Sequence, residues 1–434
     1  MMINKLLKFK LLNVLFCFSL FILQTKGQDM NHVKETISNL CSEQFKGRGY
    51  THKGDSLASD YIAKLLKKNK VKSFPGGYFQ PFSISVNTFP GMMKIAINDS
   101  VMKPGYDYLV SSTTNTIKGT FPIIVLDKNI VDFPERFKTI NTDSISKSFV
   151  LIDTLLLKNK GFRDAANDML NYNLLGAKGV IEVENKNLMY SPSPVVFPFP
   201  KIYIQRNSLF EEMKTISVSI ENEYYKAYTT RNIIGFIPGK IDSFIVFTAH
   251  YDHLGEMGKG IYFPGANDNA SGTAMLTELA KYFVKNKRKL DYSIAFIFFS
   301  AEELGLLGST HYSENPVFPL SKIKFLVNLD MVGSGDKGIM VVNGTEHKQE
   351  FQKLVNINNI NNYLPKIMIR GPRANSDHFP FHQKGVKAFF IYTEGEYSEY
   401  HSIYDKPEDL PLSEFSDLYK LLIDFYRSIN SVAE

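Results

Sequence analysis

The sequence predicts an α/β fold with a largely parallel central sheet, and three observations support this fold class. From about residue 231, apolar runs rich in β-favouring residues alternate with helix-like segments; the runs include FIVFTA, YSIAFIFFSA, KFLVNLD and KAFFIY. Such continuous runs are typical of parallel strands that helices cover on both faces. Polar and acidic residues follow the ends of these runs, where open α/β sheets bind ligands. The 434-residue chain is also 44% hydrophobic and 22% charged, close to the average of ordinary globular proteins.

Residues 1–27 have the pattern of a secretory signal peptide. Lys5, Lys8 and Lys10 precede an apolar run at 11–23, which small residues follow. The run is shorter than the ~20 residues that a membrane-spanning helix needs. We therefore expect a secreted or periplasmic protein with no membrane span after signal cleavage. The alternative is an uncleaved N-terminal anchor.

The charge balance argues against one class of partner. The formal net charge is +6, but residues 1–27 contain four lysines and no acid, which leaves 46 basic and 44 acidic residues. This near-neutral remainder gives no reason to expect a nucleic-acid partner. Cys41 is the only cysteine after the predicted signal, so the mature chain cannot form an intrachain disulfide.

Three further segments differ in their sequence pattern. Residues 28–94 include one amphipathic helix, in which apolar residues from Leu57 to Leu66 recur at helical spacing. Residues 95–220 contain short β-rich runs separated by turns, which indicates a compact unit of its own. The segment 221–434 contains the alternating strands and helices of the main α/β unit.

Two candidate metal-binding motifs follow the first strand of that unit. In AHYDH, His250 and Asp252 point to the same side of an extended chain, so Asp252 could accept a hydrogen bond from the His250 ring while the other ring nitrogen binds a metal. The alternative is an incidental polar strand end. In the turn PGANDNASG, Asp268 is a second candidate ligand, or simply a cap for the helix that follows. Asn269 begins a glycosylation sequon, which we interpret as a false positive because a glycan would cover the site.

More acidic and imidazole side chains follow the later strands. Glu302 and Glu303 come directly after FIFFSA, where two adjacent acids are costly unless a cation neutralises them. Their side chains diverge in extended backbone, so one could bind the cation while the other faces a substrate. The alternative is a surface loop with exposed acids. Asp330 ends the strand FLVNLD, and His401 lies in EYHSIYDKPEDL.

Together, two imidazoles and three carboxylates form a set of ligands for two metal ions: His250, Asp268, Glu303, Asp330 and His401. Imidazole and carboxylate suit zinc, and a shared carboxylate can hold two ions about 3.5–4 Å apart. Two Zn²⁺ ions, three carboxylates and one hydroxide nearly cancel in charge. We therefore expect two zinc ions per chain.

At this point the sequence resembles the M28 metallopeptidases, which are zinc aminopeptidases with a phosphorylase/hydrolase-like three-layer α/β fold. The resemblance runs in order through AHYDH, GANDNASG, SAEELGLLGS, NLDMVG, SDHFPF and YHSIYDKPEDL. It covers about 231–430 strongly and the segment from GRGY to YFQPF more weakly. It implies that 28–94 and 221–434 form one zinc peptidase domain. The β-rich segment 95–220 resembles a protease-associated (PA) domain inserted between them.

The resemblance implies a place for each metal ligand. Asp268 matches the residue that bridges the two metals. His250 and Asp330 match the residues that complete one metal site, and Glu303 and His401 match those that complete the other.

The resemblance also implies the chemistry, which is hydrolysis of N-terminal residues from peptides by a metal-bridging hydroxide. Glu302 matches the general base, Asp252 matches the acid behind the ligands, and Tyr400 matches a position that can donate a hydrogen bond to the tetrahedral oxyanion. Specificity for the amino terminus rests on the resemblance and on the acidic site, which favours a cationic ammonium group. Arg370 and Arg373 precede SDHFPF and leave a carboxyl-terminal specificity open.

Two other functions fit the same fold. A glutaminyl cyclase uses one zinc ion for intramolecular transfer, and receptor-like binding modules combine this fold with a PA domain without activity. The chain retains all five ligand positions, which favours the peptidase. The sequence does not determine the oligomeric state, the preferred side chain or the role of the inserted segment.

Overall fold

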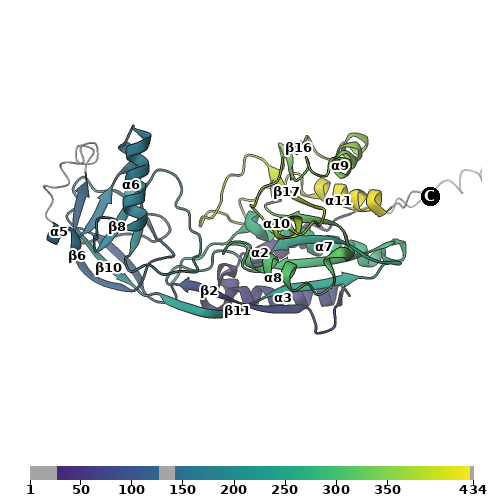
Figure 1. Ribbon diagram of the computed structural model, residues 1–434, viewed down its shortest axis with the longest axis horizontal. Coiled ribbons are helices and arrows are strands. Elements are labelled where there is room, and N and C mark those ends of the chain that lie inside the picture. Colours follow the sequence, from purple (N-terminus) through teal and green to yellow (C-terminus); the bar gives the residue numbers. More distant parts are fainter. Residues whose placement is uncertain (1–26, 127–141, 431–434) are drawn as a thin grey trace, which may run out of the picture.

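The computed structural model describes residues 27–126 and 142–430, which form two β-sheets with their covering helices (Figure 1). Nearly all of the predicted signal peptide at 1–27 lies outside the described residues. The larger sheet and its helices lie on the right of Figure 1, and the smaller unit lies on the left.

The larger sheet has nine strands in the order β1-β11-β13-β12-β14-β17-β15-β16, and β2 also pairs with β11. Their bounds are β1 Lys72–Ser73, β2 Phe79–Thr88, β11 Glu223–Ile237, β12 Ile241–His250, β13 Tyr292–Phe299, β14 Ile323–Leu329, β15 Gly338–Val342, β16 Ile367–Ile369 and β17 Ala388–Glu394.

The centre of this sheet confirms the predicted parallel arrangement. The neighbouring strands β13, β12, β14 and β17 are all parallel to one another. The flanks differ, because β11 runs antiparallel to β13 and β15 runs antiparallel to β17. The apolar runs FIVFTA, YSIAFIFFSA, KFLVNLD and KAFFIY supply the four parallel strands, whose inner residues are almost all buried.

Helices cover both faces of the sheet, as the continuous apolar runs predict. On one face, Phe247 and Phe296 pack with residues of α2 (Met30–Leu40), α3 (Gly54–Lys68), α7 (Gly272–Lys285), α9 (Lys348–Asn361) and α11 (Phe415–Asn430). On the other face, Val246 and Ile297 pack with residues of α8 (Leu307–Glu314) and α10 (His378–Gln383). The result is the expected three-layer arrangement.

Helix α3 confirms the predicted amphipathic segment, since Leu65 and Leu66 are buried, but its first predicted apolar residue, Leu57, is not. Leu57 is 41% exposed, whereas Ala58, Ile62 and Leu66 are fully buried against the sheet. The helix begins at Gly54, which places the stripe from Ala58 to Leu66 toward the core and turns Leu57 outward.

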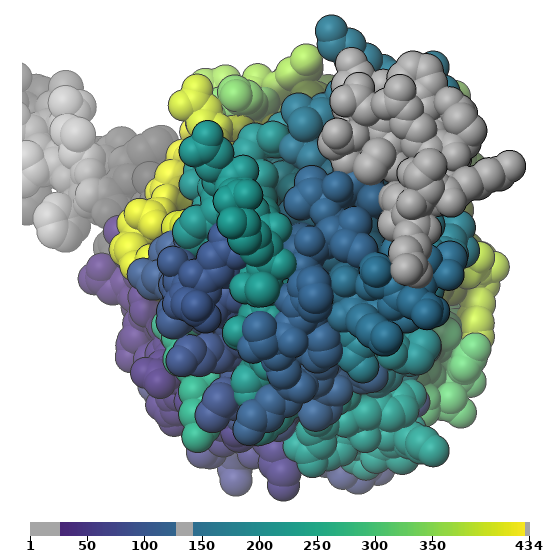
Figure 2. All heavy atoms as spheres, turned by 90° about the vertical axis from the view of Figure 1, so that its left-hand side faces the viewer, coloured from purple at the N-terminus to yellow at the C-terminus, as the bar shows by residue number. Residues whose placement is uncertain are grey.

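The smaller unit has an eight-stranded sheet in the order β4-β3-β10-β6-β7-β8-β9-β5. Its elements are β3 Met93–Ile97, β4 Ser100–Val101, β5 Tyr108–Val110, β6 Ile117–Leu126, α5 Thr142–Ser146, β7 Phe149–Ile152, α6 Lys160–Tyr172, β8 Gly179–Glu184, β9 Lys201–Gln205 and β10 Thr215–Ile220. Seen from this end, the blue and teal atoms of the unit occupy much of the front of the molecule (Figure 2).

A long antiparallel ribbon and a shared core connect the two units. Strand β11 pairs with β2 from Glu223 opposite Thr88 to Ile233 opposite Phe79, and it then continues into the larger sheet beside β13 (Figure 1). The core of the smaller unit also includes Met257, Phe263 and Ile403, which come from loops of the larger unit. The loops beside β12 and before α11 are therefore held partly by the smaller unit.

Within residues 27–126 and 142–430, no helix combines the length and the apolar character that crossing a membrane requires.

Candidate metal centre

His250 is the last residue of the central strand β12, and its imidazole contacts two of the candidate carboxylate ligands. Its Nε2 atom lies 3.2 Å from Asp268 Oδ1 and 3.2 Å from Asp330 Oδ1. Its Nδ1 atom lies 3.2 Å from the main-chain carbonyl of Asp252, whereas the Asp252 carboxylate is 3.8 Å away. The carbonyl of Asp252, rather than its carboxylate, is thus the nearer acceptor for the His250 ring.

The Asp252 carboxylate contacts two other groups instead. It accepts hydrogen bonds from the Tyr50 hydroxyl at 3.0 Å and from the main-chain N–H of Glu302 at 3.3 Å. Burial raises the pKa of Asp252 to about 7, and the nearby His250 opposes that effect. Asp252 therefore links the end of β12 to the backbone that follows β13, behind the candidate ligands.

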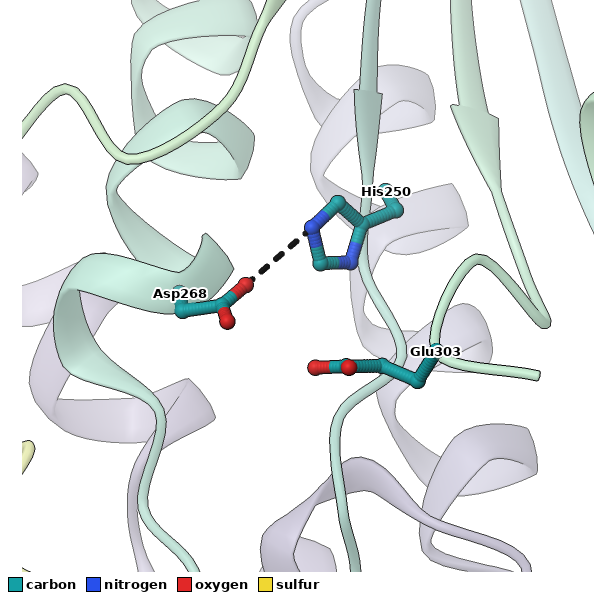
Figure 3. A group of neighbouring side chains, drawn as sticks. All are labelled: His250, Asp268 and Glu303. Carbon is teal, nitrogen blue, oxygen red and sulfur yellow. Dashed lines mark ion pairs between the residues drawn. The ribbon is translucent and has the colours of Figure 1, made fainter. Parts of the chain in front are cut away.

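Asp268 lies between the imidazoles of His250 and His401. Figure 3 shows its carboxylate pointing toward His250. Its Oδ1 atom faces His250, and its Oδ2 atom lies 3.2 Å from His401 Nε2. It sits in the turn Ala266–Ser271 before α7, where the Asp405 carboxylate accepts the N–H groups of Asn267 and Asp268 at 2.9 and 3.0 Å. The chain thus presents one oxygen of Asp268 to each half of the site.

The second half of the site consists of Glu303 and His401. Glu303 Oε2 lies 3.0 Å from His401 Nε2, and Glu303 Oε1 lies 2.8 Å from His253 Nδ1. The His401 ring also contacts the Ser191 hydroxyl through Nδ1 at 3.2 Å. His253 therefore orients Glu303 and Ser191 orients His401, as residues behind metal-binding side chains commonly do.

The remaining candidates lie at the edge of this group. Glu302 can approach His250 and Asp330 closely enough for one ion, since ligand atoms of the three residues lie within 4.8 Å of one another. Asp330 accepts a hydrogen bond from the Ser376 hydroxyl at 2.7 Å. Tyr400 is 44% exposed, and its ring stacks on the His401 ring at a centroid distance of 3.8 Å. All eight predicted site residues thus meet in one region.

The charges in this region compensate one another. Burial would lower the pKa of His401, but Glu303 and Asp268 raise it to about 11. Burial and Asp268 would raise the pKa of Glu303, yet His401 and His253 hold it at about 2. Burial would also lower the pKa of His250, which Asp330 and Glu302 instead raise well above its usual value. The carboxylates thus favour positive charge between them, and bound cations would displace the imidazole protons.

The donor set fits two metal ions. His250 and Asp330 converge on one oxygen of Asp268, and His401 and Glu303 converge on the other. Among the described residues, two groups have the spacing of metal ligands, His250 with Asp268 and Glu303, and His250 with Glu302 and Asp330. Imidazole nitrogen and carboxylate oxygen are both ordinary zinc ligands.

Arg48 is a central residue of the site that the sequence analysis missed. It is fully buried, and its guanidinium donates hydrogen bonds to the main-chain carbonyls of Leu40, Tyr251, Pro264, Gly265 and Asp268. Its segment packs so closely that a Cβ on Gly49 would lie 2.4 Å from Gly255 Cα. The motif GRGY contains this arginine, but the motif alone does not reveal which loops the arginine contacts.

Asp405, Ser376 and Ser191 were also missed as partners of the ligands. Asp405 and Ser376 lie inside the quoted motifs YHSIYDKPEDL and SDHFPF, so these motifs were the available signal. Ser191 comes from the smaller unit, and no sequence pattern connects it with His401. The sequon at Asn269 is a false positive, because Asn269 is fully buried and its amide hydrogen-bonds to the carbonyl of Leu329.

Comparisons with known proteins agree with the fold. Residues 232–426 match the model of Peptidase family M28. Aminopeptidase YwaD of Bacillus subtilis is 32% identical over 254 residues, which cover 55% of this chain and 53% of that protein. A probable leucine aminopeptidase of Arthroderma otae is 29% identical over 174 residues, covering 37% and 45%. The chain thus spans about half the length of the curated relatives it matches.

Solved structures resemble nearly the whole chain. BSAP, a zinc aminopeptidase from Bacillus subtilis, aligns with a TM-score of 0.69 over 94% of this chain and 97% of that chain, at 22% identity. A peptidase M28 precursor from Shewanella amazonensis gives a TM-score of 0.69 over 93% and 94%, at 17% identity. These likenesses establish the fold of both units together.

Helices cover both faces of the larger sheet, and the imidazoles and carboxylates lie at its carboxyl edge, where open α/β sheets bind ligands. Residues 232–426 of this chain are thus similar in sequence to peptidase family M28.

Proposed function

We propose that this protein is an aminopeptidase that uses two zinc ions per chain to release single residues from the amino termini of peptides. The observation that carries the proposal is the position of Asp268, whose two carboxylate oxygens each face one imidazole–carboxylate pair. The family match and the aminopeptidase names of the relatives support the reaction class.

In this proposal Asp268 holds both ions, His250 and Asp330 complete one site, and Glu303 and His401 complete the other. When bound, the zinc ions supply an activated water molecule and Lewis-acid stabilisation of the developing oxyanion. The chain supplies the ligands in two fixed pairs, each oriented by hydrogen bonds from outside the site.

Glu302 is the residue that we assign to proton transfer. Burial raises the pKa of its carboxyl well above the usual value, which the charge of His250 opposes. A raised pKa makes this carboxylate a better proton acceptor, so it can take a proton from water and then deliver it to the leaving amine. Asp252 positions this residue by accepting the Glu302 N–H.

Tyr400 is the residue that we assign to the oxyanion. Its ring lies on the His401 ring at the exposed edge of the site, so its hydroxyl can reach a bound substrate. Burial and the surrounding acids, Asp268 first among them, raise the pKa of its hydroxyl. The hydroxyl therefore stays protonated and available as a donor.

The acidic character of the site also supports recognition of an amino terminus. Glu302, Glu303 and Asp330 all belong to the groups of candidate ligands that share His250, so a substrate's α-ammonium group would approach an acidic region. Arg370, a candidate clamp for a terminal carboxylate, donates a hydrogen bond to the Tyr392 hydroxyl at 3.1 Å. We further propose that the protein acts outside the cytoplasm, on the basis of the signal pattern at 1–27, and that the smaller unit is a PA domain.

The test compares three leucine peptides: one with free termini, one acetylated at the amino terminus and one amidated at the carboxyl terminus. Acetylation should abolish hydrolysis and amidation should have little effect. The reverse result would contradict the aminopeptidase and make Arg370 or Arg373 the candidate clamp.

Metal analysis separates the alternative functions. About two zinc ions per chain are expected for the peptidase, one for a glutaminyl cyclase and none for a receptor-like module. Chelation should abolish turnover and added Zn²⁺ should restore it. Full hydrolysis by protein shown to be metal-free would overturn the proposal.

A further inference from the structure

A cavity of about 530 Å³ lies in the smaller unit, and the proposed peptidase function does not use it. Its floor is formed by strands β8 and β9, and one wall is the segment from Asn187 to Ser193. Polar groups dominate the lining, including the hydroxyls of Ser111, Thr113 and Ser191. A polar cavity of this size can hold one or two residues of an extended peptide.

The wall of this cavity is attached directly to a candidate metal ligand. The Ser191 hydroxyl lies 3.2 Å from His401 Nδ1, and the Tyr190 N–H donates to the His401 carbonyl at 3.0 Å. Asn187 donates to the carboxylate of Glu399 at 3.0 Å, two residues before His401. Three successive contacts therefore place the cavity next to the His401 side of the metal centre.

The wall from Asn187 to Ser193 also packs into the core that the two units share. The Tyr190 ring is buried and stacks on Phe263 at a centroid distance of 5.1 Å. Phe263 belongs to the loop that leads into the Asp268 turn and lies in the shared core with Met257 and Ile403. The wall is thus held in one position relative to the metal centre.

The charges in the cavity point to a cationic ligand. Lys201 is 6% exposed, and its ammonium group is paired with Glu182 at 2.6 Å and with Asn171. Glu184 lies two residues beyond Glu182 on the same face of β8. Within the described part of the chain, no ion pair involves Glu184. The charged side chains that line the cavity are therefore one lysine and two glutamates, and the lysine pairs with Glu182. Among these described residues, the carboxylate of Glu184 remains as the unpaired charge.

We propose that this cavity binds the downstream part of the peptide substrate, and that Glu184 selects a basic side chain there. The proposal rests on the proposed function, because a substrate held by its amino terminus at the metals must extend its remaining residues away from them. An extended chain advances about 3.3 Å per residue. Because Ser191 of the cavity wall contacts His401, the cavity lies within a few residues of the substrate's amino terminus, and the test varies the third, fourth and fifth residues.

The test uses pentapeptides that begin with leucine and carry lysine, glutamine or glutamate at position 3, 4 or 5, with alanine elsewhere. We expect kcat/KM for the lysine peptide to exceed that of its glutamine counterpart about three- to tenfold at one or more of these positions. Glu184→Gln should remove this ratio, and Glu184→Lys should invert it in favour of the glutamate peptide. Glu211→Gln, the same charge change at an exposed acid elsewhere in the unit, should keep the wild-type ratio.

Leucine p-nitroanilide, which has no downstream residues, separates the two proposals. If the zinc-loaded protein cleaves it but shows equal kcat/KM for all three peptide series, the cavity proposal is wrong and the peptidase stands. A lysine preference that persists in Glu184→Gln would also overturn the proposed cavity. Absence of cleavage of every substrate with two zinc ions bound would refute the peptidase and the cavity proposal together.

Discussion

Glu302 and Glu303 are adjacent in the sequence, yet their carboxylates meet different partners. Glu303 contacts His253 and His401, whereas Glu302 lies near His250 and Asp330. Ala301, just before them, has a φ of +59°, so the chain turns sharply as it leaves β13. This turn separates the two acids and allows them to have different roles.

We predict that Glu302→Gln keeps two zinc ions and loses about 10²–10⁴-fold in kcat, because it removes proton transfer but no ligand. Glu303→Gln should lose zinc instead, since its carboxylate faces His401. Metal content by atomic absorption, measured alongside kcat, distinguishes them, with Glu314→Gln on the surface as a control. If Glu302→Gln lost zinc in proportion to activity, the two roles would have to be exchanged.

Asp268→Asn should have the largest effect on zinc content of any single ligand change. The amide keeps the size of the side chain but offers one neutral oxygen where the carboxylate offers one oxygen to each pair. We expect both zinc ions to be weakened, whereas Asp330→Asn should weaken one. Zinc titrations of the two variants check this, and equal stoichiometry in both would contradict a shared ligand.

At the scale of elements, Arg48 connects three segments, two of which lie beside the candidate ligands His250 and Asp268. Its hydrogen bonds reach the end of α2, the loop after β12 and the turn before α7. Each carbonyl that it satisfies is buried, where an unsatisfied polar group costs about 1–3 kcal/mol. The site therefore depends on an arginine that does not belong to the ligand set.

Arg48→Met should lower the free energy of unfolding by about 3 kcal/mol or more, because it leaves several buried carbonyls without a donor. The measurement is urea unfolding in the presence of a chelator, so that metal loss does not contribute. Arg288→Met at an exposed position should change stability by less than about 0.5 kcal/mol. A similarly small effect of Arg48→Met would show that water can replace the guanidinium.

The elements also show what could be predicted from the sequence and what could not. His250, Glu302 and Asp330 follow apolar runs, and the carboxyl ends of parallel strands lie at one edge of a sheet, so their proximity was predictable. The partners of these residues were not, because Arg48 and Ser191 come from distant segments that no periodicity connects. The prediction of a largely parallel sheet is confirmed, but which strands are antiparallel could not be predicted, since an apolar run does not reveal its direction relative to its neighbour.

At the scale of the whole molecule, burial of ionisable groups makes stability depend on pH. His378 is fully buried, and burial lowers the pKa of its imidazole to about 3. Between pH 3 and the ordinary value near 6.5, the unfolded chain binds a proton that the folded chain does not. The folded state should therefore lose stability as the pH falls through this range.

We predict that His378→Leu weakens this pH dependence. Between pH 7.5 and 5.0 the wild type should lose about 2 kcal/mol more stability than the variant, because leucine takes up no proton on unfolding. Urea unfolding of both proteins with a chelator at the two pH values measures the difference. Parallel losses would mean that the His378 ring is solvated in the folded state.

The ribbon of β2 and β11 also has a consequence for protein engineering. Both passages of the chain into the smaller unit run through this ribbon, and Thr88 and Glu223 lie opposite each other within it. A two-residue Asn-Gly hairpin turn could therefore close the chain at this register and replace residues 89–222. Such a minimal protein would keep all five candidate ligands but lose the hydroxyl of Ser191 that contacts His401. It would show whether the excised unit is a removable module or a structural support for one zinc ligand.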